Sequence, residues 1–408
     1  MLLVALISSA LVHAKQNSPH RFIGNVTLVT NYQDSGNTWL NGGLGRFGQG
    51  DQDSSVSGLF ESNIEYRYRP SSAFQLSTHI QAQGTSNDSS VRSLGVIEWS
   101  ARYRHDIDFN QALSVKLGQF FLPTSMENID RFWESPYTIS YSSLNSWIGE
   151  EFHPIGLDMS YRYHFDSGPE LSAAATVFGG NDSMGALLAY RGWTYGRQRT
   201  VLGDVLALPE LSNLQDGQIF AGQRDDGTKP FGRDLDGRPG YALRSSLALD
   251  ELNIKLTWVD NRGDTTLLHA EYAWKTRFAM AGLAWRISEG WEFLSEASQG
   301  SSEMGAGPGI DIDFYSLYGM FSYRLNDYRI SYRYDQFGID DQDQMDQENN
   351  EFGRSHTLAL MWQEEDSALR LGAEVLFLKS KRYRVLEGPQ VYRDSDSISV
   401  SMLAQYTF

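Results

Sequence analysis

The stretch that decides the fold is the last one, Ser397-Ile398-Ser399-Val400-Ser401-Met402-Leu403-Ala404-Gln405-Tyr406-Thr407-Phe408. From Ile398 to Phe408 every second residue is apolar or aromatic, while most of the residues between them are polar. Successive side chains of a β-strand point to opposite faces, so this alternation predicts a strand with one apolar and one wet face.

The same alternation recurs along the chain, and short turns alternate with long loops between the alternating segments. A transmembrane barrel with short turns on one side and long loops on the other has this pattern. We therefore predict an all-β antiparallel transmembrane barrel of about sixteen strands. The predicted strands are 22–32, 58–69, 73–83, 92–105, 112–121, 155–165, 170–179, 239–249, 252–260, 275–287, 290–300, 313–325, 328–337, 354–364, 368–379 and 396–408.

Two segments leave the strand count open. Residues 184–193, within the long loop 180–238, could form another strand, and the facing of 275–287 is ambiguous. An even count places both ends of the chain on the periplasmic side. The terminal Phe408 in an aromatic-rich strand resembles the signal that bacterial barrels present to the barrel assembly machinery.

Composition limits the alternatives. Of the 408 residues none is cysteine, which excludes disulfides, thiolate metal ligands and a thiol nucleophile. The formal net charge of -17 argues against nucleic acid as a partner, whereas acidic loops can meet lipopolysaccharide through divalent cations. A soluble β-sandwich or propeller is the main structural alternative. Segments such as Tyr66-Arg67-Tyr68, with rings on one face and arginine on the other beside a short turn, favour a barrel interface.

The N-terminal residues 1–14, MLLVALISSALVHA, have a short apolar stretch followed by a small-residue cleavage pattern. We interpret them as a signal peptide and residues 15–408 as the outer-membrane barrel of a Gram-negative bacterium. The usual positive charge at the start of a signal peptide is missing, and a buried first strand is the alternative.

The loop 122–154 is the segment most informative about function, because it is too aromatic for an ordinary solvated loop. As the third outer loop, it can offset the entropy of its ordering by packing against the inner wall, where it would narrow the pore. Its predicted pore-constriction residues are Glu127, Asp130, Arg131, Glu134, Glu150 and Glu151.

The segment Leu117-Gly118-Gln119-Phe120-Phe121-Leu122-Pro123-Thr124-Ser125-Met126-Glu127 resembles the strand-to-loop segment of the phosphate-selective porin O/P family. Residues 145–151 and 188–193 are also similar to segments of its relatives. The resemblance implies a sixteen-stranded barrel, a homotrimer and an inward-folded third loop. This chain departs from the lysine-rich mouth of characterised members, because its lysines are sparse.

Basic side chains predicted to face the lumen are the candidates for ion preference, since rings of charge at a narrow point select ions. They either guide anions or pair with wall acids such as Glu61, Glu65, Glu98, Asp158, Asp335 and Glu374. The predicted lumen cations are Arg67, Arg69, Arg102, Arg104, Lys116, Arg162, Arg244, Lys255, Arg329, Arg333 and Arg370.

The function predicted from these features is passive diffusion of small polar or anionic solutes, with phosphate as a candidate. A channel specific for a substrate such as an oligosaccharide is the second hypothesis, and an outer-membrane enzyme or adhesin is the third. The inward histidines expected at 79, 105 and 164 have no nucleophile at a suggestive spacing, so we predict no catalytic residue, cofactor or metal. The acidic turns at 225–227 and 234–237 only partly match calcium loops.

Overall fold

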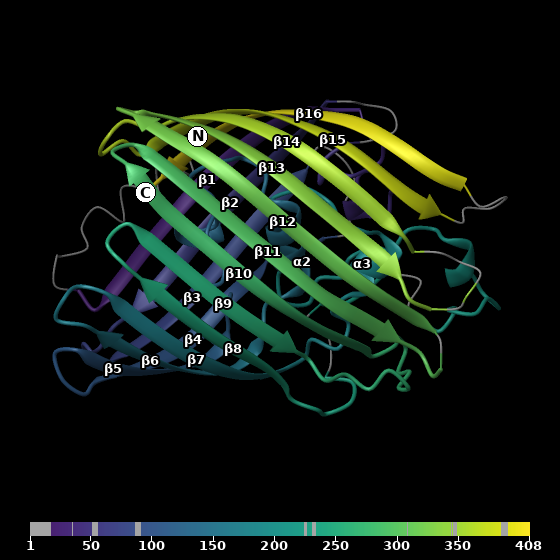
Figure 1. Cartoon of the computed structure of the whole chain (residues 1–408), viewed down its shortest axis with the longest axis horizontal. Helices are drawn as coiled ribbons and strands as arrows, with labels where there is room; N and C mark the ends of the chain where they lie inside the picture. The colour runs from purple at the N-terminus through teal and green to yellow at the C-terminus, as the bar shows by residue number, and fades with distance from the viewer. Residues whose placement is uncertain are drawn as a thin grey trace.

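The computed structural model describes residues 18–34, 36–50, 56–85, 91–223, 227–230, 234–307, 309–343, 345, 349–384 and 391–408. The predicted signal peptide lies outside these residues. Sixteen antiparallel strands form a closed barrel in which each strand pairs with its neighbours in sequence (Figure 1). They are β1 (His20–Gln33), β2 (Val56–Tyr68), β3 (Phe74–Thr85), β4 (Leu94–Asp106), β5 (Gln111–Gln119), β6 (Ile155–His164), β7 (Glu170–Gly179), β8 (Gly240–Ala248), β9 (Leu252–Asp260), β10 (Trp274–Ser288), β11 (Trp291–Met304), β12 (Ile310–Leu325), β13 (Tyr328–Asp341), β14 (Glu351–Trp362), β15 (Leu369–Arg384) and β16 (Val391–Thr407).

The decisive C-terminal strand closes the barrel. β16 pairs with β15 on one side and with β1 on the other, with Val26 opposite Tyr406 and Tyr32 opposite Val400. Gly24 N donates to Phe408 O at 2.9 Å, and Phe408 N donates to Gly24 O at 2.8 Å. Closure leaves no free sheet edge, which is the condition for strands to cross a lipid bilayer. The fold prediction, including all sixteen strands, is confirmed.

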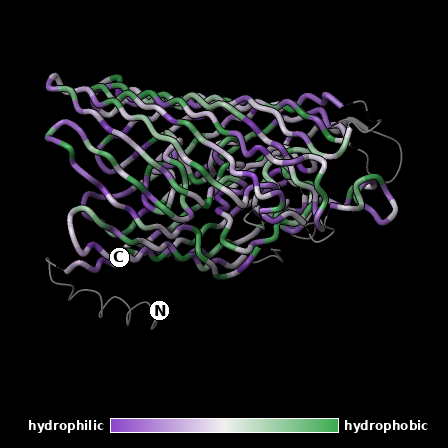
Figure 2. The backbone as a smooth tube through the Cα atoms, turned by 90° about the horizontal axis from the view of Figure 1, so that it is seen from below, coloured by the Kyte–Doolittle hydropathy of each residue, from purple (hydrophilic) through white to green (hydrophobic). Residues whose placement is uncertain are grey.

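Apolar and polar residues alternate along the strands, as Figure 2 shows by colour. Large apolar side chains such as Leu28, Leu117 and Phe377 are exposed on the outer surface, as they must be in contact with lipid. In β4, His105 shares the outward face with Tyr103, so the expectation that His105 faces the lumen is wrong. This barrel with an apolar outer surface places the protein in the outer membrane of a Gram-negative bacterium.

The facing of β10, which the sequence left ambiguous, is explained by the loops that cover its inner face. Its inward residues Phe278 and Met280 are themselves apolar, because they contact loops folded into the barrel rather than water. Apolar residues therefore occupy both faces of β10, and the sequence of this strand shows no strict alternation of apolar and polar residues.

The helical elements lie in the loops, and α2 and α3 sit within the outline of the barrel, toward the end opposite the C-terminus (Figure 1). Residues 184–193 form no strand but include α3, so the sixteen-strand count needs no addition. Among the described residues, we find no helix with the length and hydropathy of a membrane span. The helical elements are η1 (Trp39–Asn41), η2 (Arg131–Trp133), α2 (Ser143–Glu151), α3 (Ala186–Tyr190) and η3 (Ser212–Leu214).

Candidate functional site

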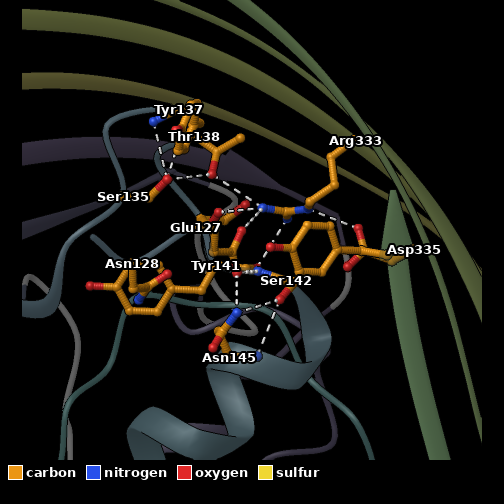
Figure 3. A network of polar contacts seen from close by, with 12 residues as sticks. Glu127, Asn128, Ser135, Tyr137, Thr138, Tyr141, Ser142, Asn145, Arg333 and Asp335 are labelled. Atoms are coloured by element: carbon orange, nitrogen blue, oxygen red, sulfur yellow. Dashed lines mark hydrogen bonds and ion pairs between the residues drawn. The ribbon is translucent and has the colours of Figure 1, made fainter. Parts of the chain in front are cut away.

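The third outer loop, residues 122–154, is fastened to the inner wall by a buried arginine of β13. Arg333 Nη1 lies 3.1 Å from Glu127 Oε2 of the loop, and Arg333 Nε lies 2.9 Å from Asp335 Oδ2 of the same strand. The three side chains are fully buried. Arg333 also donates to the carbonyl oxygens of Ser140 and Tyr141, so its guanidinium joins strand and loop (Figure 3).

Glu127 also organises the start of α2. Its Oε1 accepts hydrogen bonds from Ser142 N at 2.7 Å and from Asn145 Nδ2 at 2.9 Å. Ser142 is the N-cap of the helix, and its hydroxyl accepts from Asn145 N, as an N-cap serine does. The loop therefore has one defined arrangement against β12 and β13.

The other predicted constriction residues behave differently from one another. Asp130 pairs with Arg370 at 2.5 Å, whereas Arg131 is exposed. Glu134, Glu150 and Glu151 are buried and partnered, so they hold the loop in place instead of projecting into open water.

Burial raises the pKa of Glu150, which pairs with Arg191, and raises the pKa of Glu151 to about 7. Glu151 accepts hydrogen bonds from Trp147 Nε1 at 2.6 Å and from Gly185 N and Leu187 N at 3.1 Å. The Glu151 carboxylate thus joins α2 to the first turn of α3.

A second loop, 180–238, also enters the barrel, and the sequence prediction treated it only as a long outer loop. Arg197 Nε lies 2.8 Å from Glu61 Oε2 of β2, and Arg197 Nη2 lies 3.4 Å from Glu134 Oε1 of the third loop. Arg199 reaches the same two carboxylates at 3.5 and 3.4 Å. We call Glu61, Glu134, Arg197 and Arg199 the ion cluster.

The charges of the ion cluster stabilise one another. Burial alone raises the pKa of Glu134, but Arg199, Arg197 and a hydrogen bond from Gln405 outweigh it and hold that pKa below its ordinary value. Burial likewise opposes the charge on Arg197, yet Glu61 and Glu134 raise its pKa. Both groups therefore stay charged, and the cluster ties two loops to the wall.

A set of five rings lies on the other side of the lumen, and we call it the aromatic cluster. Its ring centroids are 5.1 to 6.2 Å apart in the contacting pairs. Two rings come from the loops and three from β10, β12 and β13: Trp147, Trp193, Phe278, Phe314 and Phe337. All five are buried, so this side of the outer lumen is filled by side chains.

The first outer loop joins the same assembly. Arg46 Nη1 lies 2.6 Å from Glu351 of β14, and Arg382 of β15 lies 3.4 Å from the same carboxylate. Trp193 N donates to Glu351 at 3.1 Å. The sequence analysis did not identify the loop arginines as candidates. A signal was available, because residues with a spacing of two in this loop are arginine or aromatic: Arg191, Trp193, Tyr195, Arg197 and Arg199.

Seven of the predicted lumen cations form ion pairs with described acids, which for these seven supports pairing with acids over the guiding of anions. The described residues include no acid paired with the remaining four, Arg69, Arg102, Lys116 and Lys255. The pairs are Arg67–Glu65, Arg104–Asp106, Arg162–Glu170, Arg244–Asp158, Arg329–Glu292, Arg333–Glu127 and Arg370–Asp130.

A cavity of about 450 Å³ lies on the inner wall of β4 to β9, toward the periplasmic end. Its charged lining consists of five cations and two acids, so it is net positive: Arg102, Arg104, Arg162, Arg244, Lys255, Asp158 and Glu170. Lys255 Nζ donates to Ser125 O of the third loop at 2.8 Å. We call this cavity the basic vestibule.

The acidic turn at 234–237 lies beside Asp182, a neighbour that the sequence did not indicate. Carboxylate oxygens of Asp182, Asp234 and Asp236 lie within 4.8 Å of one another. Asp182 Oδ2 accepts from Leu235 N at 2.5 Å, and burial raises its pKa to about 6. Asp225 and Asp226 of the other acidic turn lie outside the described residues.

Solved structures of bacterial outer-membrane proteins share the fold of this closed barrel. The anion-selective porin from Comamonas acidovorans is similar with a TM-score of 0.55 and 10% identity, over 95% of this chain and 99% of that chain. The outer membrane channel DcaP of Acinetobacter baumannii gives a TM-score of 0.53 and 13% identity, over 95% and 97%. In-vitro folded OmpT, an outer membrane protein of Vibrio cholerae, gives 0.55 and 8%, over 97% and 100%. No family model and no curated protein matches, so these likenesses establish the fold alone.

Proposed function

We propose that this protein is a passive diffusion channel for small polar or anionic solutes, phosphate among the candidates. The observation that carries the proposal is the basic vestibule: a net-positive cavity inside a closed barrel, with Arg102 and Lys255 unpaired by any described acid. A wall with surplus positive charge in a confined lumen raises the local concentration of anions.

The loops supply the restriction in this proposal. The third loop and the loop 180–238 both occupy the outer lumen, so they limit the size of what passes and favour small solutes over oligosaccharides. The proposal includes lipid and lipopolysaccharide as the surroundings of the barrel. It also includes recognition of the terminal strand, which ends at Phe408, by the barrel assembly machinery. A homotrimer is part of the proposal, and one similar structure of Vibrio cholerae OmpT is described as a trimer form.

Conductance in planar bilayers tests the proposal. The purified protein should give stepwise openings, and reversal potentials in a salt gradient should favour anions. Arg102→Ala should lower the anion preference, because it removes a charge that no described acid neutralises. Lys379→Ala is the control, since Lys379 lies outside the basic vestibule and its pair with Asp396 is exposed. Absence of any conductance, or equal effects of the two substitutions, would contradict the proposal, and the first result would favour an enzyme or adhesin.

A further inference from the structure

The floor of the basic vestibule consists of small inward side chains of β5 to β8. Ser114 of β5 lies opposite Ser160 of β6, and all the serines named in this paragraph line the cavity. Ser172 of β7 lies opposite Ser246 of β8, and their hydroxyl oxygens are 2.6 Å apart. Because a serine side chain is short, this floor leaves room for a ligand. It also offers the ligand hydroxyl groups that both donate and accept hydrogen bonds.

Cations line both edges of this serine floor. Arg102 and Arg104 extend into the cavity from β4 on one edge. Arg244 of β8 and Lys255 of β9 extend into it on the other edge. Five strand spacings, about 24 Å along the curved wall, separate β4 from β9. Long side chains that point into the lumen shorten this span, but they leave it wider than a single phosphate or carboxylate group.

The two acids of the vestibule neutralise cations other than the outermost ones. Asp158 pairs with Arg244, and Glu170 Oε2 lies 3.7 Å from Arg162 Nη1. The cations of the cavity that no described acid pairs are therefore Arg102 and Lys255. One of them belongs to each edge, so the surplus positive charge is divided between the two ends of the serine floor.

The edge formed by β8 and β9 also keeps hydrogen-bond donors in reserve. The Arg244 side chain is 10% exposed, and its buried Nε has no hydrogen-bond partner among the described residues. Lys255 uses one of its three N–H groups for Ser125 O. Because a buried donor without a partner costs free energy, such groups beside a cavity are typical of a site that a polar ligand or water completes.

The size and access of the vestibule suit an organic solute. Its volume of about 450 Å³ lies within the range of small-molecule sites and exceeds what a phosphate ion fills. A second cavity of about 750 Å³, lined by the periplasmic turn 106–111, shares Arg104, Arg162 and Glu170 with it. The vestibule is therefore continuous with the periplasmic mouth of the barrel.

We propose that the basic vestibule binds elongated organic dianions in which a short hydroxylated chain joins two carboxylates. One carboxylate contacts the β4 edge at Arg102, the other contacts the opposite edge at Lys255, and the hydroxyls lie on the serine floor. A compact anion contacts one edge at a time and is held less tightly. The inference rests on the proposed function, because it names the class of anion that the channel binds.

Block of the potassium chloride current in planar bilayers tests the binding site in the full-length protein. Glucarate, a hydroxylated dicarboxylate, should reduce the single-channel current in a saturable way. Gluconate has the same chain with one carboxylate, and inorganic phosphate is a compact anion. The half-blocking concentration of glucarate should be at least about tenfold lower than that of either control, because each control lacks one charged contact. Adipate, a dicarboxylate of the same length without hydroxyls, should block several-fold more weakly than glucarate.

Substitutions on the two edges test how the dianion is held. Arg102→Gln and Lys255→Gln should each raise the half-blocking concentration of glucarate several-fold. Each should change that of gluconate less, because its single carboxylate can use the remaining edge. Lys379→Ala, outside the vestibule, should leave both concentrations unchanged. If Lys255→Gln fails to fold, Ser246→Asp tests the same edge, because residue 246 lies opposite Lys255 and lines the cavity.

The outcomes separate the ways in which the inference can fail. If glucarate blocks no more strongly than gluconate or phosphate in a channel that prefers anions, the binding site is overturned and the proposed function stands. An effect of only one of the two edge variants on glucarate would overturn the two-edge arrangement. Equal block by adipate and glucarate would overturn the role of the serine floor. Absence of conductance in the unmodified protein would overturn the proposed function itself.

Discussion

The two sides of the lumen have the same backbone architecture, but the outer part of one holds the loops mainly by polar groups and the outer part of the other mainly by aromatic rings. On the wall of β16, β1 and β2, loops are held by the ion cluster and by amide and hydroxyl groups. On the wall of β10, β12 and β13, the same loops are held by the aromatic cluster and, nearer the periplasm, by the buried ion pairs of Arg333 with Glu127 and Asp335. The difference matters because polar groups can bind water when their contacts loosen, whereas exposing an aromatic cluster to water costs free energy.

The largest effect is expected from breaking the ion cluster. Arg199→Met should lower the free energy of unfolding by about 3–5 kcal/mol, since it leaves two buried carboxylates to Arg197 alone. Urea titration in lipid vesicles measures it. Lys379→Ala is the control: its pair with Asp396 is exposed, so its loss should cost about 1 kcal/mol or less.

A double variant sharpens this result. Glu134→Gln combined with Arg199→Met should cost less than the two single substitutions added together, because the two groups share one interaction. Strict additivity would show that the ion cluster does not couple the two loops.

A smaller effect is expected on the aromatic side. Trp193→Phe removes the indole hydrogen bond to Gly338 O, which is 3.1 Å long, and leaves a small void. We expect a loss of about 1–2 kcal/mol in the same urea titration. Trp291→Phe on the lipid-facing surface should change stability by about 0.5 kcal/mol or less. If Trp193→Phe has no more effect than Trp291→Phe, the aromatic cluster does not hold the loop.

The smallest effect is expected from pH. Burial raises the pKa of Glu151 to about 7 and that of Asp182 and Asp204 to about 6. The packed loops therefore bind protons that unpacked loops release, so their stability rises as the pH falls through these values toward the ordinary range of carboxyl groups. Because more stably packed loops obstruct the lumen for more of the time, the open probability of the channel should decrease when the pH is lowered from about 8 to about 5.5.

Substitutions test the origin of this pH dependence. Glu151→Gln should weaken the response, because it removes the group with the most raised pKa of the three. Glu289→Gln, on an exposed periplasmic turn, should retain the wild-type response. A current that increases on acidification would contradict the assignment.

The barrel was predictable because period-two alternation is a local property of strands that face lipid on one side. β16, with Ile398 and Val400 outward and Ser399 and Ser401 inward, shows it most clearly. The facing of β10 was unclear because Phe278 contacts inserted loops, so both faces of that strand carry apolar residues. The candidate site was accessible to prediction only in part: alternation assigns arginines to one face of each strand, but their pairing with acids up to 240 residues away has no local signal.

The sequence by itself determined the sixteen strands, their order and the composition of the two barrel faces, because alternation and turn residues act over a few neighbouring positions. Only the tertiary structure decided that the loop 180–238 fills the lumen beside the third loop, and that Arg197 meets Glu61. Those contacts join segments far apart in the chain. They form only when the closed wall confines both loops, so that buried charges must find partners and aromatic side chains must exclude water.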